Sequence, residues 1–135
     1  MMYLLDSNIC IHFMRNKETS QRIKAKILQH KADDIRLPVI VVAELLHGAY
    51  HSKRIEGNLR ETTDFIADFY VVPFDSAEAD MYGQIRASLE RKGQVIGNND
   101  MLIAATALIR NATLVTNNTS EFSRIDGLKL DDWTL

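Results

Sequence analysis

The chain has 135 residues, of which 46% are hydrophobic and 25% are charged. This length is enough for one buried core and short for two ordinary domains, so we expect a single domain over residues 1–135. The formal net charge of −2 gives no overall attraction to nucleic acid or to an anionic membrane. A polyanionic ligand would therefore have to be held by a local basic patch or through metal ions.

The one cysteine, Cys10, lies in an apolar run and has no partner for a disulfide within the chain, which fits a reducing cytosol. No uncharged apolar run approaches the ~20 residues that a membrane-spanning helix needs, and the first residues do not form a signal peptide. We therefore expect a soluble cytoplasmic protein without a membrane segment.

Short apolar runs alternate with helical patterns along the chain. Strands are expected at residues 2–5, 35–37, 70–72, 113–116 and 128–130. Helices are expected after Asp6, within 15–31, from 39, within 55–69, from 75 to a stop at Gly93, and from about 98 to 109. This alternation predicts a parallel sheet covered on both faces, which is a three-layer α/β/α sandwich.

The first strand is followed directly by the polar residues Asp6, Ser7 and Asn8. Asp6 or Ser7 can cap the helix that follows, and capping alone would explain either residue. Ligands of open α/β sheets also bind at the carboxyl ends of the strands, where Asp6 would lie. Asp6 is therefore a candidate site residue.

Glu44 is the single charge in the apolar run 39–46. A carboxylate among apolar residues needs a cation, hydrogen bonds or a metal, so Glu44 requires a partner inside the fold or in a cleft. A structural ion pair with an arginine is the alternative. Glu44 also begins a Glu-x-x-His motif with His47, and His51 follows one turn later, but the motif occurs once and two surface histidines explain it more simply than a zinc or iron site.

Asp100 is the one acid in the segment 94–109, whose residues from 101 to 109 are apolar or small on every face. Gly97 and Asn98 can cap this buried helix, which places Asp100 in its first turn. The positive end of the helix dipole favours the ionised carboxylate there. By contrast, we interpret Asp75, Glu78 and Asp80 as helix-start and surface acids, with Asp75 and Glu78 in a capping box.

Residues 15–31 hold the one local concentration of positive charge, which comprises Arg15, Lys17, Arg22, Lys24, Lys26 and Lys31. Ile23 and Ile27 give this segment a helical apolar stripe and leave most of the lysines on the wet face. A solvated helix face is the commoner explanation of such a pattern. Contact with phosphates is the functional alternative.

In a parallel sheet, Asp6, Glu44, Asp100 and the polar residues 117–121 would all fall at one end. Three or four carboxylates there would repel one another unless a cation neutralised them or some took up protons. Ligation by oxygen alone favours Mg²⁺, with Mn²⁺ as a substitute, over zinc. Metal-assisted hydrolysis of phosphodiesters is the chemistry that such a site serves.

Four stretches in this order and spacing resemble the motifs of a known family: Leu-Asp-Ser-Asn-Ile-Cys-Ile at 5–11, Ala-Glu-Leu-Leu-His-Gly-Ala at 43–49, Ile-Gly-Asn-Asn-Asp-Met-Leu-Ile-Ala-Ala at 96–105 and Leu-Val-Thr-Asn-Asn-Thr-Ser-Glu-Phe at 114–122. They are similar to PIN domains, specifically to VapC-type toxins of type II toxin-antitoxin systems. The resemblance spans essentially the whole chain, including its closing Gly-Leu-Lys-Leu-Asp-Asp-Trp. It implies a PIN-like fold and a Mg²⁺-dependent endoribonuclease that cuts structured RNA, most closely the subgroup acting on tRNA.

The resemblance also implies a VapB-type antitoxin as inhibitor, and a homodimer. It assigns the metal mainly to Asp6 and Asp100, with Glu44 completing the acidic site. The fourth acid is Glu121, where the wider family most often has Asp, with Asn118 as a neighbouring candidate. Ser7 stands where Thr is commoner, and Val39 and Val41 stand where Ser or Thr is frequent, so a polar contact near Glu44 is in doubt.

We therefore expect a metal-dependent ribonuclease with Asp6, Glu44, Asp100 and Glu121 as catalytic residues. Asp6 and Asp100 would bind the metal directly, and the two glutamates would act through water or as a base. Residues Ser7, Asn8 and Asn118 would shape the site, and Arg15, Lys17, Arg22, Lys24 and Lys26 would contact RNA. Two alternatives remain open at this point: a non-catalytic module that binds RNA or a protein, and a nuclease that acts on DNA.

Overall fold

The strands of the computed structural model, which describes residues 1–135, form one five-stranded sheet. In spatial order β3-β2-β1-β4-β5, they are β3 (Tyr70–Val72), β2 (Ile35–Pro38), β1 (Tyr3–Leu5), β4 (Thr113–Val115) and β5 (Lys129–Asp131). All four pairings between neighbours are parallel. Every strand therefore ends at the same edge of the sheet, as the alternating pattern of the sequence predicts.

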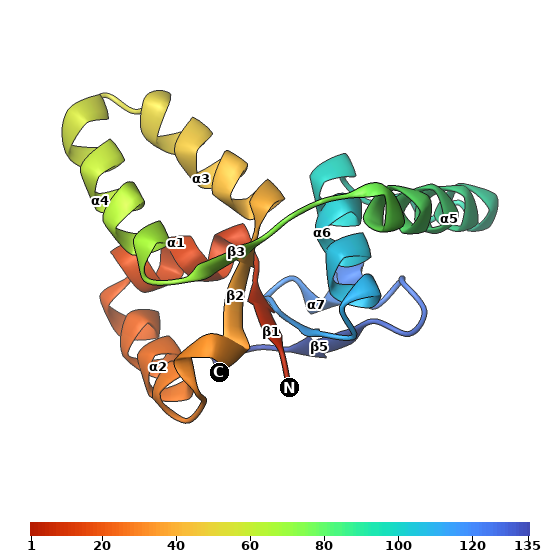
Figure 1. Cartoon of the computed structure of the whole chain (residues 1–135), viewed down its shortest axis with the longest axis horizontal. Helices are drawn as coiled ribbons and strands as arrows, with labels where there is room; N and C mark the ends of the chain where they lie inside the picture. The colour runs from red at the N-terminus through yellow and green to blue at the C-terminus, as the bar shows by residue number, and fades with distance from the viewer.

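Seven α-helices connect and cover these strands: α1 (Ser7–Arg15), α2 (Lys17–Leu28), α3 (Val39–Tyr50), α4 (Ile55–Ala67), α5 (Ser76–Lys92), α6 (Asn98–Ile109) and α7 (Thr119–Phe122). A short 3-10 turn, Ala32–Asp34, precedes β2. The chain steps from β1 to β3 in one direction and then crosses to β4 and β5 in the other. Because parallel crossovers are right-handed, α1 to α4 cover one face and α5 to α7 the other. Figure 1 shows these two groups on opposite sides of the strands, which confirms the three-layer sandwich.

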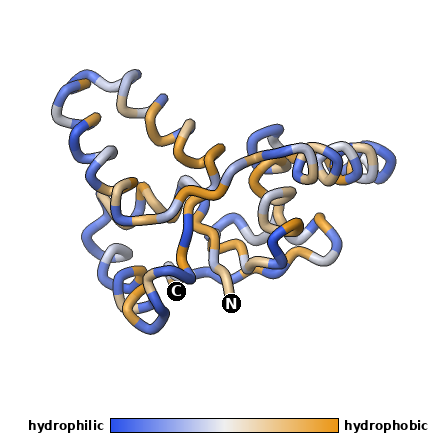
Figure 2. The backbone as a smooth tube through the Cα atoms, viewed as in Figure 1, coloured by the Kyte–Doolittle hydropathy of each residue, from blue (hydrophilic) through white to orange (hydrophobic).

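The core lies where the central strands meet the helices. Figure 2, in which the chain is coloured by residue hydropathy, shows hydrophobic residues there. Both faces of β1 and β4 are covered, so Leu4, Leu5, Leu114 and Val115 are fully buried. Cys10 is also fully buried, as expected of a small hydrophobe in an apolar run. Helix α6 buries its Met101 and every residue from Ile103 to Ala107. The buried helix that the sequence predicts around Asp100 is thus confirmed.

The helix boundaries follow local signals in the sequence. The carboxylate of Asp6 accepts a hydrogen bond of 2.9 Å from the Ile9 N–H and caps α1. Asp75 and Glu78 form the predicted capping box at the start of α5, and Gly93 ends that helix with a φ of 67°, a left-handed conformation that favours glycine. These signals depend on residues within four positions of one another, so they are readable from sequence.

One assignment from the sequence is wrong. The pattern predicts Glu78 on the surface, but only 3% of it is exposed. Its carboxylate accepts from the Asp75 N–H at 2.7 Å and lies 3.4 Å from a guanidinium nitrogen of Arg110, at the end of α6. The sequence pattern misses this burial because the partner is 32 positions away. None of the helices combines the length and the hydrophobicity that crossing a membrane would require.

Candidate metal-dependent nuclease site

Asp6 stands at the carboxyl end of the central strand β1. Its N–H donates to the Val115 carbonyl at 3.1 Å, which continues the pairing of β1 with β4 by one residue. Only 5% of Asp6 is exposed. This burial raises the pKa of the carboxyl to about 6, against hydrogen bonds from Thr116 and Ile9 that lower it, while the charges of Asp100 and Glu44 raise it further.

Glu44 lies half-buried in the second turn of α3, and both of its carboxylate oxygens accept hydrogen bonds. The Ser7 hydroxyl donates to Oε1 at 2.6 Å, and Nδ2 of Asn99 donates to Oε2 at 3.3 Å. Ser7 belongs to α1 and Asn99 to α6, so the three side chains join three helices. Val39 and Val41 carry no hydroxyl, which put a polar contact near Glu44 in doubt. Ser7 and Asn99 supply two such contacts instead.

Asp100 occupies the first turn of α6, as the sequence predicts, and it is half-buried. Burial raises the pKa of its carboxyl, and the negative charges of Glu44 and Glu121 raise it further. Gly97 precedes this turn, and a Cβ at Gly97 would lie 3.6 Å from Oδ2 of Asp100, an ordinary contact. The N-terminal end of α6 therefore faces two other acids.

Glu121 lies in the short helix α7, which follows β4. The side-chain amide of Asn118 donates to Oε2 of Glu121 at 3.1 Å, and the Asn118 N–H donates to Thr116 Oγ1 at 2.9 Å. Asn118 thus contacts Glu121 and the residue that also bonds Asp6. Glu121 and Asn118, the two candidates for the fourth group, are thus hydrogen-bonded to each other.

The four acids come from four elements and meet at the carboxyl end of the sheet. The charge of Asp6 is coupled to those of Asp100 and Glu44, and the charge of Asp100 to those of Glu44 and Glu121. None of them lies within 4.0 Å of a Lys, Arg or His nitrogen, because the five ion pairs of the molecule all involve other acids. The cluster therefore carries negative charge with no cation from the protein.

This donor set fits a hard divalent cation. All the acidic groups are oxygen ligands, and a cation would offset the repulsion that raises the pKa of Asp6 and Asp100. No three His, Cys, Asp or Glu side chains converge closely enough to surround an ion by themselves. Mg²⁺ commonly keeps several water ligands and takes only one or two carboxylates, so a pair such as Asp6 and Asp100 suffices for it.

The other residues singled out in the sequence lie in different settings. Asn8 is exposed and makes no hydrogen bond to the four acids. Arg15 lies 3.8 Å from Glu61 and shares a small pocket with Glu44 between α1, α3 and α4. The remaining predicted RNA contacts, Lys17, Arg22, Lys24 and Lys26, all lie on α2, which packs on α1. The rings of His47 and His51 stack 5.6 Å apart on the exposed side of α3.

Sequence reasoning misses two polar residues at this site. Asn99, which donates to Glu44, is not among the predicted site residues, although its neighbour Asp100 is. An amide beside an acid in the first turn of a helix could have marked Asn99 as a site residue. Thr116 reads as the last residue of a strand, yet it is fully buried and its hydroxyl accepts from the Asn118 N–H. A polar residue closing an apolar strand could have marked it.

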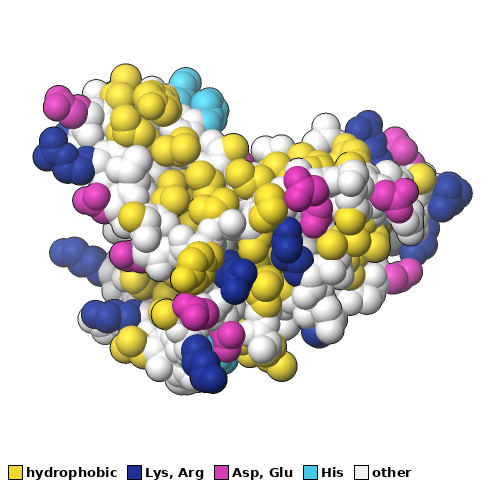
Figure 3. Space-filling model, in the orientation of Figure 1, with side chains coloured by type: hydrophobic (Ala, Val, Ile, Leu, Met, Phe, Trp, Pro, Cys, Tyr) yellow, Lys and Arg dark blue, Asp and Glu magenta, His cyan; other side chains and the backbone are white.

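The site opens to solvent between α3 and α6. A shallow hollow there is lined by Glu44 and by the four residues at the start of α6, Gly97, Asn98, Asn99 and Asp100. In the space-filling view the outline of the molecule is indented between the lobe of α3 and α4 and the lobe of α5 and α6 (Figure 3). Glu44 and Asp100 thus line a hollow that is open to solvent, whereas Asp6 lies buried.

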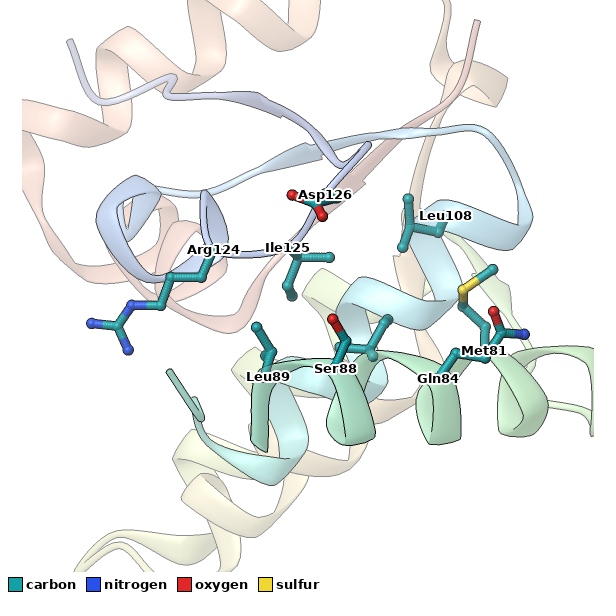
Figure 4. A pocket seen from close by; sticks show the side chains of 9 residues that line it. Met81, Gln84, Ser88, Leu89, Leu108, Arg124, Ile125 and Asp126 are labelled. Atoms are coloured by element: carbon teal, nitrogen blue, oxygen red, sulfur yellow. The ribbon is translucent and has the colours of Figure 1, made fainter. Parts of the chain in front are cut away.

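A second pocket lies between α5, α6 and the segment after α7, and it contains none of the four acids. Leu89, Leu108 and Ile125 line it, and the side chain of Arg124 extends away from it (Figure 4). Asp126 at its rim pairs with Lys92 at 3.2 Å. This pocket holds one acid, Asp126, which is paired with Lys92, so the acidic cluster at the end of the sheet is the stronger candidate for the functional site.

The parallel sheet with acids at its carboxyl end is an arrangement suited to a nuclease domain. The family model of the PIN domain matches residues 3–128. The chain belongs to the PIN domain family.

Particular relatives refine this placement. The chain is 41% identical over 133 residues to Ribonuclease VapC2 of Rickettsia felis, with 98% of both chains covered. It is 39% identical to the tRNA(fMet)-specific endonuclease VapC of Shigella flexneri, again with 98% of both covered. The crystal structure of DNA-bound VapBC from Salmonella typhimurium contains a chain that matches with a TM-score of 0.92 at 36% identity, with 98% of each chain covered. These relatives place the chain among the VapC members of the family.

Proposed function

We propose that this chain is the toxin of a type II toxin-antitoxin system and a Mg²⁺-dependent endoribonuclease whose substrate is tRNA. The observation that carries the proposal is the cluster of Asp6, Glu44, Asp100 and Glu121, which has no protein cation within ion-pair distance. Relatives named as ribonucleases and as tRNA(fMet)-specific endonucleases support the substrate class. Cleavage of tRNA would stop translation in the cytoplasm.

Asp6 and Asp100 would hold the metal ion. In addition to burial, the charge of Asp100 raises the pKa of Asp6, and the charge of Glu44 raises the pKa of both carboxyls. When bound, Mg²⁺ supplies positive charge for the phosphodiester and lowers the pKa of a water molecule, and Mn²⁺ can substitute for it. Asp6 is held for this role by its hydrogen bonds to Ile9 and Thr116.

Glu44 and Glu121 would orient the attacking water and take up its proton. Glu44 is suited to this because Ser7 and Asn99 hold both of its oxygens in place. Glu121 is oriented by the amide of Asn118. Ser7 and Asn118 thus shape the site through defined contacts, whereas Asn8 would act from the exposed rim, where substrate arrives.

Relatives of the chain support the proposal of an antitoxin partner. Solved structures of VapBC complexes from Rickettsia felis, Salmonella typhimurium and Haemophilus influenzae contain chains similar to this one. We propose a VapB-type antitoxin as the inhibitor of this chain, and a homodimer of the chain as the toxic form. Size-exclusion chromatography with light scattering, with and without the co-expressed antitoxin, tests both assignments.

The test of the activity is cleavage of total cellular RNA by the purified, antitoxin-free protein with Mg²⁺ and with EDTA, followed by sequencing of the new ends. Discrete ends in tRNA that need Mg²⁺ and are absent with Asp100→Asn support the proposal. Ser88→Ala, in the apolar pocket that contains none of the acids, is the matched control and should cleave normally.

Other results would redirect the assignment. Cleavage confined to DNA would make the chain a DNA-directed nuclease. No cleavage by a folded protein that binds Mg²⁺ would make it a binding module for RNA or protein. Ends in messenger or ribosomal RNA alone would retain the ribonuclease and overturn tRNA as substrate.

A further inference from the structure

His12 connects its own helix α1 with the next helix, α2, and with the loop after β4, which is 105 positions away in sequence. It lies half-buried in the last turn of α1. Its Nδ1 atom is 3.2 Å from Oγ1 of Thr19 in α2, and its Nε2 atom is 3.2 Å from Nδ2 of Asn117, in the loop after β4. Both ring nitrogens therefore lie within hydrogen-bond distance of another side chain.

The chemistry of the partners sets the role of each nitrogen. The side-chain nitrogen Nδ2 of Asn117 is an amide NH₂ group, which can donate a hydrogen bond but cannot accept one. Nε2 of His12 must therefore accept. An imidazole that accepts at Nε2 is neutral and carries its proton on Nδ1. That proton is donated to the Thr19 hydroxyl, which fixes the tautomer and the orientation of the ring.

Asn117 begins the loop that leads to Glu121. The backbone on one side of it is anchored by fully buried Thr116, and Phe122, at the end of α7, is buried on the other side. Between these anchors Asn117 is exposed, and its side chain makes one hydrogen bond, the bond to His12 across 105 positions of sequence. Asn118, the next residue, orients Glu121 through its amide.

We propose that His12 is a positioning residue, which holds the loop at Asn117 and thereby sets where Asn118 presents Glu121. This inference rests on the proposed function, since the position of Glu121 matters only if the acidic cluster is catalytic. His12 touches none of the four acids and acts through Asn117 alone. Its loss should therefore impair the chemical step and leave RNA binding unchanged.

The experiment compares four variants in steady-state and single-turnover cleavage of an initiator tRNA transcript with Mg²⁺. His12→Phe keeps the ring shape and removes both hydrogen bonds, His12→Gln restores an acceptor, Asn117→Ala removes the donor, and a double variant carries both His12→Phe and Asn117→Ala. His30→Phe is the matched control, because His30 packs on Tyr3 and Trp133 at the opposite end of the sheet.

We expect His12→Phe and Asn117→Ala each to lower kcat about tenfold with an unchanged KM, in line with residues that orient active groups. The double variant should lose no more than His12→Phe alone, because both single variants already remove the same bond between His12 and Asn117. His12→Gln should recover most of the rate, and His30→Phe should cleave normally. Equal melting temperatures would separate these losses from unfolding.

Three results would overturn the assignment. They are a normal kcat for His12→Phe, losses that multiply in the double variant, and a rise in KM that accounts for the loss. Glu121→Gln distinguishes a failure of the positioning role from a failure of the nuclease assignment. Full activity of this variant beside an inactive Asp100→Asn retains the nuclease and refutes the positioning role. Absence of cleavage by the unaltered protein refutes both.

Discussion

The hydroxyl of Ser7 donates a hydrogen bond of 2.6 Å to Glu44 across 37 positions of sequence. Ser7 is the first residue of α1 and Glu44 lies in α3, so this bond ties the end of β1 to the helix that follows β2. The second oxygen of Glu44 accepts from Asn99 of α6. Glu44 is therefore held by residues of both α1 and α6.

Removal of the Ser7 hydroxyl should loosen Glu44 and slow cleavage. We expect Ser7→Ala to lower the single-turnover rate about tenfold, as is typical for partners that orient active groups. Ser7→Thr keeps the hydroxyl and should restore the rate to within about twofold. A normal rate for Ser7→Ala in a folded protein would show that Glu44 does not need this contact.

The stability of the metal-free protein should fall as the pH rises through the pKa of Asp6. Folding raises this pKa from 3.8 to about 6, so the folded state holds the proton more tightly than the unfolded state. The resulting stabilisation is complete below the unfolded value and is lost as the pH passes the folded value. The shift corresponds to at most about 3 kcal/mol.

Asp6→Asn should remove this pH dependence while keeping the cap on α1, because an amide oxygen can still accept from the Ile9 N–H. Mg²⁺ should stabilise the unaltered protein more at about pH 7.5 than at about pH 5, since it binds the ionised carboxylate. Thermal unfolding of both proteins across this range, with Mg²⁺ and with EDTA, checks each point. Parallel pH curves for the two proteins would contradict the assignment to Asp6.

The sequence predicts that the basic residues of α2 contact RNA, and cleavage kinetics can test this prediction. Lys24 is exposed, whereas Arg22 is partly engaged with Glu18 and with the Thr134 carbonyl. If α2 contacts phosphates, Lys24→Glu should raise KM for tRNA about fivefold with kcat unchanged, and it should flatten the salt dependence of binding. Lys129→Glu on the edge strand β5 makes the same change of net charge and should leave KM near normal. Equal effects of both variants would indicate a general charge effect.

The pair of Glu78 and Arg110 should be the most sensitive polar contact for stability. Glu78 is buried, and Arg110 also donates to the Pro73 carbonyl at 3.1 Å, so the pair joins α6 to the start of α5. Arg110→Met leaves a buried carboxylate without its cation and should lower the free energy of unfolding by about 3 kcal/mol. Glu78→Gln should cost about 1 kcal/mol, because the amide still accepts from the Asp75 N–H. Urea unfolding measures both, and a larger loss for Glu78→Gln would contradict this ranking.

Much of the fold could be predicted because its signals are local. The apolar runs of β1 and β4, the cap at Asp6, the capping box at Asp75 and the stop at Gly93 each depend on a few neighbouring residues. The same holds for Asp100 in the first turn of a buried helix. Parallel topology then follows from the alternation of strands and helices, and it brings these acids to one end of the sheet.

Short-range patterns in the sequence predicted the five strands, six of the seven α-helices and the candidate acids Asp6, Glu44 and Asp100, since backbone hydrogen bonding and hydrophobic periodicity act over short distances along the chain. Glu121 came from the family resemblance, and the short helix α7 around it was not predicted. Only tertiary packing decided which contacts hold those acids in place. Ser7 and Asn99 meet at Glu44, Thr116 meets Asn118, and His12 reaches Asn117. Packing also buried Glu78. Most of these contacts join helices and loops on different crossovers of the sheet, and their distances depend on how the layers pack, which no local pattern encodes.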